Sequence, residues 1–478
     1  MRSFDEKKGW FEQTAGLGKS FDVTFREMTF AGVRTGFLYL NGMIKDRAFN
    51  DILDRLSVLT RDDLQPRVFT AVVQRYLPHI QVFIEKDPQK VLHYVFSGVT
   101  AMILDREQDF VMIDARMYPA RNPEEPITER MVRGSRDGFV ETLLTNVALV
   151  RRRIRDPRLI TELVTVADRS QTDVCLLFIS DLVDQKLLEI LRNRLANIHT
   201  DGIPIADQQL EEWLVKAPLN PYPMARYTER PDVVAAHLLD GHIVLMADTS
   251  PSVLIIPATF WQHLQHAEEF RHTPLIGTYL RIVRFLGVWA SIWLSPLWLL
   301  FVNNTNFLPT SMTFIGPTAV GHIPLLLQFV FAEIGIDLMR MAAVHTPAPL
   351  ATSTGLIAAV LIGDVAIKVG LFSPEVILYI AIVAIGSFAT PSYELGLANR
   401  ISRLVILLLT GIFGLSGFAI GSTIWILLLA GQRSFFASYL WPVFPLDLPA
   451  LWDIIVRRPA NAPLKNLRAA HPLDGKAT

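Results

Sequence analysis

The sequence changes character near residue 281. Between Arg281 and Ala430 only eleven residues are Asp, Glu, Lys or Arg, although such residues make up 19% of the chain, and none occurs from Phe285 to Ala332. A helix needs about 20 consecutive apolar residues to cross a bilayer, and a stretch so poor in charge can hold several. We therefore predict a water-soluble part up to residue 280, followed by an α-helical integral membrane domain at 281–430.

The number of membrane crossings depends on two ambiguous stretches. Ile323–Met341 is apolar on one side only, and Leu404–Ala430 is longer than one crossing requires. Positive charge is typical of cytosolic loops. Arg281 and Arg284 therefore indicate a cytosolic entry to the first crossing, Arg400 and Arg403 place the loop before the second stretch in the cytosol, and Arg433 does the same for the residues after it. Both ends of this stretch can be cytosolic only if the segment bends back at its glycine-rich part, Gly411–Gly421. Otherwise the arginines at one end do not mark a cytosolic loop. We expect roughly four to six crossings, of which the clearest are Val283–Val302, Ala351–Leu371 and Pro374–Tyr393.

Charged residues inside the predicted membrane domain are the main candidate functional residues. Each costs several kcal/mol in hydrocarbon unless it is paired or hydrated. Glu333, Asp337 and Arg340 lie at i, i+4 and i+7 and share one helical face. Asp364 and Lys368 are four residues apart and can pair. These groups either join helices as neutral pairs or line a water-filled path, where Glu333 and Asp337 would attract cations.

The first 280 residues have the mixed pattern of an α/β domain. A polar tail at 1–20 is expected to precede a first subdomain at 21–118, and a proline-rich linker begins a second subdomain at 119–280. Hairpins are predicted at Asn41-Gly42, before Phe110–Ala115, and between Ile243 and Ile256. We detect no internal repeat. Residues 431–478 are expected to form a C-terminal cytosolic tail.

Two features indicate a cytosolic location for the soluble part. Cys175 is the only cysteine, so no intrachain disulfide can form, as is typical of a reducing compartment. The N-terminus has no apolar run of the kind found in signal peptides. We expect the first hydrophobic helix to act as the insertion signal.

No motif for catalysis, metal binding or cofactor binding is present, and we expect neither an enzyme nor a cofactor. His263 and His266, with Glu268, Glu269 and His272 nearby, offer potential metal ligands, but we interpret this segment as a solvated helix face just before the membrane. A set of arginines is either paired with nearby carboxylates or bound to lipid headgroups or a partner subunit, rather than to nucleic acid. The set consists of Arg130, Arg133, Arg136, Arg151, Arg152, Arg153, Arg155 and Arg158.

Several short sequence motifs are more informative about the family of this chain than its composition is. They are Glu125-Pro126 with Glu129, Arg133-Gly134-Ser-Arg136-Asp-Gly138-Phe139-Val-Glu141, Thr228-Glu-Arg230-Pro231-Asp232, Gly241-His, Ser387-Phe388-Ala-Thr-Pro391-Ser-Tyr393-Glu-Leu-Gly396, and Arg433-Ser434-Phe435. In this order the chain resembles the A-subunit family of bacterial spore germinant receptors, from about residue 22 to about residue 445. We expect mainly structural roles for these motifs: a tight turn at Gly134 and Gly138, and a fixed link between the subdomains at Arg230-Pro231-Asp232.

The resemblance implies an architecture and an activity. It implies a cytosolic domain of two α/β subdomains and a helical domain in the spore inner membrane. It also implies assembly into a ring, expected to be a pentamer, that acts as an ion channel in germination. Partners would be the lipid bilayer and other germination membrane proteins. Asp364 and Lys368 depart from the lysine-free Gly-Gln pattern expected of a receptor subunit, which argues against direct sensing of nutrients.

Three functions remain open from the sequence. The main hypothesis is a subunit of an oligomeric channel that releases monovalent cations during germination. The alternative is a non-conducting scaffold or signal-transducing subunit of a germination membrane complex. A transporter of a small anion, using the arginines and Lys368, would need an inverted repeat that we do not detect.

Overall fold

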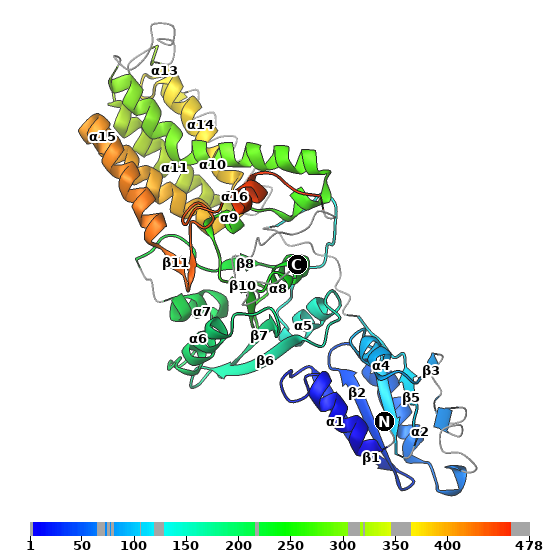
Figure 1. Ribbon diagram of the computed structural model, residues 1–478. Coiled ribbons are helices and arrows are strands. Elements are labelled where there is room, and N and C mark those ends of the chain that lie inside the picture. Colours follow the sequence, from blue (N-terminus) through cyan, green and yellow to red (C-terminus); the bar gives the residue numbers. More distant parts are fainter. Residues whose placement is uncertain are drawn as a thin grey trace.

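The computed structural model describes residues 3–64, 72–73, 77, 81–105, 107–118, 129–215, 219–304, 316–318, 321–345 and 365–459. Two α/β subdomains follow each other along the chain, and a helical half lies beyond the second (Figure 1). The predicted fold class, two α/β subdomains followed by a region of apolar helices, is confirmed.

The first subdomain is a five-stranded antiparallel sheet with helices against it. Its strand order is β1-β2-β4-β5-β3, and both faces are covered by apolar clusters. Ala101 and Ile103 enter one cluster and Met102 and Leu104 the other, as the alternation of a pleated strand requires. The elements are α1 (Phe4–Thr14), β1 (Val23–Phe30), β2 (Val33–Leu40), α2 (Asp46–Ser57), η1 (Asp62–Leu64), β3 (Val82–Glu85), α4 (Pro88–Val95), β4 (Thr100–Leu104) and β5 (Phe110–Ile113).

The predicted polar tail is wrong for residues 4–14, which form helix α1. Phe4, Lys7 and Phe11 recur at helical spacing and are buried on one face. The Lys7 ammonium donates a 2.6 Å hydrogen bond to the Glu107 carbonyl and lies over the Phe110 ring. Two aromatic rings and a long aliphatic side chain therefore attach this charged segment to the sheet.

The first hairpin closes earlier than the sequence predicts. Strands β1 and β2 turn at Ala31 and Gly32, where φ is 52° and 80°, rather than at Asn41-Gly42. Positive φ at two successive residues gives a tight hairpin whose twist matches that of the strands. Asn41-Gly42 instead ends β2, where the Asn41 amide donates to the Asp22 carbonyl. The other two predicted hairpins, β4–β5 and β9–β10, are confirmed.

The second subdomain has its own five-stranded antiparallel sheet, in the order β6-β7-β9-β10-β8. Two apolar clusters again cover the two faces of the sheet. The elements are α5 (Leu143–Arg151), β6 (Leu159–Val166), β7 (Thr172–Ile179), α6 (Gln185–Ala196), α7 (Ala206–Val215), β8 (Arg226–Thr228), α8 (Pro231–Leu239), β9 (Ile243–Ala247), β10 (Val253–Ile256), α9 (Phe260–His263) and η3 (Ala267–Arg271).

The two sheets are copies of one topology, which corrects the prediction of no internal repeat. Strand for strand, β1-β2-β4-β5-β3 corresponds to β6-β7-β9-β10-β8. From α4 to β5, residue n corresponds to residue n + 143 in the second subdomain, so that Pro88 matches Pro231 and Gly98 matches Gly241. Both glycines have a positive φ, 94° and 89°, at the turn from helix to strand. Few side chains are shared, which is why the repeat escapes a reading of the sequence.

The helical half consists of packed apolar helices at the far end of the molecule (Figure 1). Among the residues that the structure describes, α10 and α15 are long and apolar enough to cross a membrane by length and composition. Helices α10 and α14 cross at Gly287 and Gly386, where a Cβ on Gly386 would overlap the Gly287 backbone. The elements are α10 (Pro274–Asn303), α11 (Leu325–His345), α13 (Ala366–Lys368), α14 (Pro374–Phe388) and α15 (Tyr393–Gly431).

Helix α15 bends back on itself, which was one of the two alternatives for Leu404–Ala430. Gly414 is not helical (φ 59°, ψ −133°), and a Cβ on Gly417 would overlap the Leu409 carbonyl oxygen. The Tyr222 hydroxyl is within hydrogen-bonding distance of Ser402 on one arm and Trp425 on the other. The chain therefore enters and leaves α15 at the end next to the second subdomain.

Residues 433–455 are not a free tail. They form β11 (Arg433–Ser434), β12 (Ala437–Ser438) and α16 (Leu448–Ile455). The Ser434 hydroxyl donates to the Met224 carbonyl at 2.6 Å, and fully buried Tyr439 packs against Tyr222 and Phe260. The predicted tail is wrong over this range because its small and aromatic residues complete the core between the second subdomain and the helical half.

Candidate functional site

The charged face of α11 lies against α15. Both oxygens of Glu333 accept hydrogen bonds from the Arg403 guanidinium, at 2.8 and 2.6 Å. The two side chains are only 1% and 2% exposed, and Arg403 also donates to the Ser291 carbonyl of α10. A bidentate, fully desolvated pair of this kind holds three helices together, because either charge alone would be unstable in an apolar core.

The next two charged residues of α11 lie closer to the second subdomain. Asp337 pairs with Arg400, and its side chain remains 39% exposed. Arg340 lies over the rings of Phe388 and Tyr393, 5.1 and 6.0 Å from their centroids. The spacing of Glu333, Asp337 and Arg340 was predicted to place them on one face, and that face contacts α14 and α15. Their arginine partners on α15 were predicted to be loop charges instead.

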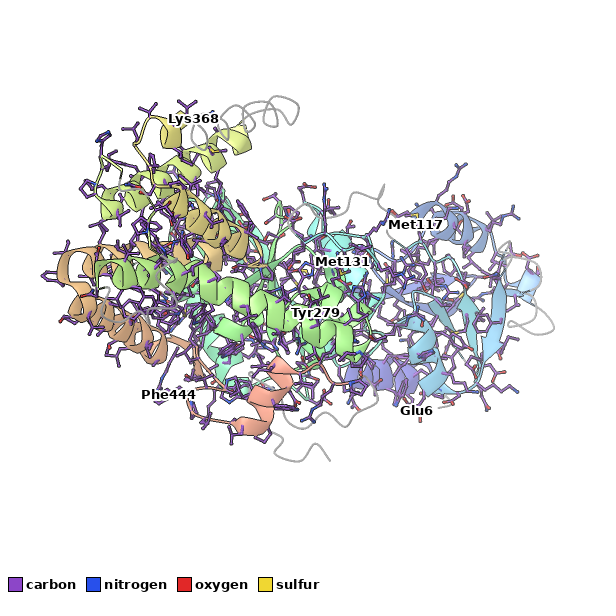
Figure 2. The ribbon with its side chains drawn as sticks, turned by 90° about the horizontal axis from the view of Figure 1, so that it is seen from above. Glu6, Met117, Met131, Tyr279, Lys368 and Phe444 are labelled. Carbon is purple, nitrogen blue, oxygen red and sulfur yellow. The ribbon has the colours of Figure 1, made fainter. Side chains whose placement is uncertain are left out.

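Of the two remaining intramembrane candidates, the structure describes only Lys368, which lies at the opposite end of the helical half. Asp364 falls outside the described residues. Lys368 ends the short helix α13, at the end of the helical half farthest from the soluble subdomains, and its side chain is exposed (Figures 1 and 2). Figure 2 shows it well away from Met131 and Met117 of the soluble part.

The segment that was predicted to be a solvated helix face is buried. Glu269 is fully buried, accepts one hydrogen bond from Arg281 and ion-pairs with Arg284, at the start of α10. His263 is also buried, and no cluster of potential metal ligands occurs among the residues that the structure describes. The prediction of a solvated face is wrong because the Glu269 carboxylate neutralises Arg281 and Arg284, which were interpreted from the sequence as positive charges on the cytosolic side of the first crossing.

Three of the eight arginines in the set form ion pairs within the chain. Arg151 binds both oxygens of Asp22, at 2.7 and 3.0 Å, and joins the two subdomains in a buried pair. Arg153 pairs with Asp137 at 2.7 Å, and Arg158 pairs with Asp156 at 2.6 Å. Internal ion pairing, the first of the two alternatives, accounts for these arginines, whereas Arg130, Arg133 and Arg136 are exposed.

Arg230 is the structural centre of the motifs in the soluble part. Its guanidinium is fully buried, binds both oxygens of Asp232 at 3.0 Å, and donates to the carbonyls of Glu129 and Ser135. Pro231 is the first residue of α8, a position where no backbone N–H is needed. These contacts attach residues 129–135 to the start of α8.

The other motif residues occupy turns and the core. Gly134 has a φ of 141°, and a Cβ there would lie 2.7 Å from the Met131 side chain. Gly138 and Phe139 are buried, and the Phe139 amide donates to the Glu229 carbonyl. The Glu141 carbonyl accepts from the Thr249 amide. Pro391 lies in the turn from α14 to α15 and Gly396 in the first turn of α15, both beside the second subdomain.

A layer of histidines lies beneath that turn, and burial keeps it neutral. Burial lowers the pKa of His242 to about 4 and that of His263 to about 3, and it lowers the pKa of His237 as well. The buried guanidinium of Arg226 adds to all three shifts. His242 is 2.9 Å from the Gln262 amide nitrogen, and its ring packs edge-on against His237. Of these three histidines, only His263 was considered from the sequence as a potential metal ligand, and it was interpreted as part of a solvated helix face.

Comparison with known proteins places the whole chain in one family. The family model described as "Bacillus/Clostridium GerA spore germination protein" matches residues 12–468. Stage V sporulation protein AF of Bacillus subtilis (strain 168) is 46% identical over 94% of this chain and 91% of its own length. The uncharacterized membrane protein YfkQ of the same organism is 29% identical over 92% of this chain and 86% of its own.

A solved structure also matches. The N-terminal domain of the A subunit of the Bacillus megaterium spore germinant receptor GerK3 aligns with 54% of this chain and 96% of its own, at 24% identity and a TM-score of 0.42. The resemblance found in the sequence motifs is confirmed by the family match and by the relatives. The chain belongs to the GerA family of spore germination proteins.

Proposed function

We propose that this chain is a non-enzymatic subunit of an oligomeric membrane ion channel that releases monovalent cations during spore germination. Family membership supports the role in germination. The apolar helices α10 and α15, and a relative whose name describes a membrane protein, support residues 281–430 as a membrane domain. The spore inner membrane is the proposed location, with the soluble subdomains in the cytosol.

The observation that carries this proposal is the different environment of two carboxylates on α11. Glu333 is fully buried and neutralised by Arg403, so its role is to hold α11 against α15. Asp337 pairs with Arg400 but keeps more than a third of its side chain exposed within an apolar helical region. A partly exposed carboxylate in such a region needs hydration, and a water-filled path for cations supplies it.

The outer surface of α11 supports assembly into a ring. Ile334, Leu338 and Met341 are exposed, and the space beside Gly335 is empty for at least 4 Å. Small residues next to apolar side chains let a second helix approach closely. We propose a ring of this chain, expected to be a pentamer, with other germination membrane proteins as partners. Counting subunits in the detergent-solubilised particle tests the ring, and a monomeric particle would contradict it.

Conduction is tested with the purified full chain in liposomes. Potassium flux is expected, and Asp337→Asn should reduce the preference for cations over anions several-fold, because it removes a charge from the path. Asp181→Asn, an exposed carboxylate of the second subdomain, serves as the matched control and should leave flux unchanged. Oligomers that stay electrically silent under every trigger, while a partner protein conducts alone, would refute the channel.

A non-conducting scaffold is the second candidate. It is favoured by the complete neutralisation of Glu333 inside a single chain, which is what helix packing alone requires. Replacing Asp337 or Asp364 by alanine separates the two functions. Changed ion selectivity supports the channel, whereas unchanged flux with loss of the assembled complex supports the scaffold.

A further inference from the structure

Helix α10 is longer than one membrane crossing requires. Its 30 residues make about 45 Å of helix, whereas the hydrocarbon of a bilayer is about 30 Å thick. The start of α10 packs against η3 and α16, and it extends beyond the other helices of the helical half in both views (Figures 1 and 2). In the proposed membrane domain, roughly the first ten residues of α10 therefore lie outside the hydrocarbon, on the side of the soluble subdomains.

This start of α10 has its polar side toward the protein and its apolar side outward. Arg281 is 4% exposed and donates hydrogen bonds to Glu269 and to two carbonyls in the last turn of α16, the latter at 2.9 and 3.0 Å. The outer side is a stripe of exposed apolar side chains at helical spacing, Leu275, Tyr279, Ile282 and Leu286. A surface helix of a water-soluble protein has the opposite arrangement, with its charges outward. The outer side of α10 is therefore suited to an apolar environment.

Helix α16 lies beside the start of α10 and adds to this surface (Figures 1 and 2). Its inner side is buried, and the Arg457 amide that follows it donates to the Thr278 hydroxyl of α10 at 3.0 Å. Its outer side and the segment before it are apolar and exposed, at Phe444, Leu446, Leu448 and Trp452. A gathering of exposed apolar side chains on two packed helices marks a contact with another molecule or with a membrane.

Positive charges surround the start of α10. A Cβ on Gly134 would lie 3.2 Å from Nε of Arg271, the last residue of η3, so the loop at Gly134 lies just before α10 begins. Arg133 and Arg136, on either side of that glycine, are exposed. The Arg457 guanidinium donates to two carbonyls of the same short stretch before α10. Positive charge next to exposed apolar side chains is typical of segments that lie on a membrane with anionic lipids.

The composition of this surface favours lipid over a second copy of the chain. Tyr279 and Trp452 are among its most exposed side chains, and such amphipathic rings are enriched where a membrane meets water. The surface also continues into the proposed crossing, since exposed Trp289 extends the stripe along α10. Packing it against the same surface of a second copy would bring the arginines of both copies together, and like charges repel.

We propose that the start of α10 and helix α16 lie on the cytosolic surface of the bilayer. Their apolar sides enter the headgroup region, and the arginines around them bind anionic lipid headgroups. Because Arg281 joins this surface to Glu269, lipid contact fixes the second subdomain against the membrane. This inference rests on the proposed membrane domain, and it depends on neither conduction nor ring assembly.

Fluorescent probes on added cysteines measure the contact with lipid. Cys175 is fully buried, so the unsubstituted chain should take up no label. The full chain is reconstituted in vesicles of equal parts phosphatidylcholine and phosphatidylglycerol, with spin-labelled phosphatidylcholine as the quencher. Probes at Leu275→Cys and Leu448→Cys should be quenched as strongly as one at Ile412→Cys in α15. A probe at Val58→Cys, equally exposed but in the first subdomain, is the control and should be quenched several-fold less.

The outcomes separate this surface from the membrane domain on which it rests. Quenching at Ile412→Cys without quenching at Leu275→Cys and Leu448→Cys would overturn the proposal and leave the membrane domain intact. Quenching at none of the three positions would refute the membrane domain, and this surface with it. Cross-linking between chains through Leu275→Cys or Leu448→Cys, by a bifunctional maleimide in the same vesicles, would assign the surface to a second copy and contradict the proposal.

The arginines are tested by the lipid that stays bound to the chain. After mild solubilisation from the same vesicles, mass spectrometry should find several-fold more phosphatidylglycerol than phosphatidylcholine. Arg133→Gln combined with Arg136→Gln should lower this excess at least about twofold. Arg26→Gln combined with Arg47→Gln removes the same charge from exposed positions of the first subdomain and should leave the excess unchanged. The same phosphatidylglycerol excess in both double variants would show that these arginines bind no headgroup, and would contradict the proposal.

Discussion

The two α/β subdomains share a topology, but they are in contact with different parts of the molecule. The second lies between the first and the helical half (Figure 1). At the turn from α4 to β4 the first copy has Tyr94 and Val99, and at the equivalent turn the second has His237 and His242. The backbone hydrogen bonds of the two turns are the same, with Val99 donating to Tyr94 and His242 to His237, each at 3.0 Å. The repeated fold thus fixes the backbone, while contact with the helical half determines which copy carries a buried polar layer.

The largest predicted effect concerns the joint between the copies. Arg151→Leu leaves the Asp22 carboxylate buried without its partner, and should lower the free energy of unfolding by about 3–5 kcal/mol. Chemical unfolding of the full chain in detergent measures this loss. Arg158→Ala removes a pair whose arginine is 58% exposed, and should cost less than about 1 kcal/mol. Similar losses in the two variants would show that the buried pair does not hold the subdomains together.

Acid should destabilise the second copy before the first. An unfolded histidine has a pKa near 6.5, whereas burial lowers that of His242 to about 4 and that of His263 to about 3. Above pH 6.5 these histidines are neutral in both the folded and the unfolded protein, so they do not affect stability. As the pH falls from 6.5 toward 4, they take up protons only in the unfolded protein, and the free energy of unfolding decreases. The loss should reach roughly 1–2 kcal/mol per histidine at pH 5.

Hydrogen exchange resolved by peptide, at pH 7 and pH 5, measures this acid effect. Peptides of β9 and β10 should lose more protection at pH 5 than those of β4 and β5. His242→Val, which copies Val99 of the first subdomain, should reduce the difference. Equal loss of protection in both copies would contradict a role for the histidine layer.

The smallest predicted effect compares the two equivalent glycines. Gly98→Ala and Gly241→Ala both place a side chain at positive φ, which costs about 1–2 kcal/mol. At Gly241 the new Cβ would also lie 3.0 Å from the Leu182 carbonyl oxygen, whereas at Gly98 it meets the movable Arg116 side chain at 3.2 Å. Gly241→Ala should therefore cost more, by roughly 1 kcal/mol. Gly9→Ala, in open space on α1, is the control in the same unfolding assay. Equal losses of unfolding free energy at Gly98 and Gly241 would show that the backbone relaxes at both turns.

The sequence predicted local structure wherever one residue pattern determines it. The β9–β10 hairpin follows from two β-branched runs around Asp248–Pro251, and the shared face of Glu333 and Asp337 follows from helical spacing. Helix α1 could not be recognised from the polar composition of residues 4–14. Its buried face consists of only three residues, Phe4, Lys7 and Phe11, and the rest of the segment is mostly charged or polar. Arg403 was assigned to a loop, because its partner Glu333 is distant in sequence and meets it only in the packed helices. The pocket between Arg226–Glu229 and Ser387–Gly396 could not be predicted for the same reason, since its two walls come from opposite halves of the chain.

The return of the chain from α15 to the second subdomain has a consequence for biosynthesis. Ser434 bonds to Met224, and Tyr439 packs beside Tyr222 and Phe260, so part of this core comes from residues made after the whole helical half. The ribosome must release residues 274–431, and these must pack, before the last contacts of the second subdomain can form. The first subdomain, whose described strands all precede residue 114, can complete its sheet long before that. Translation thus orders the assembly, and the junction closes last.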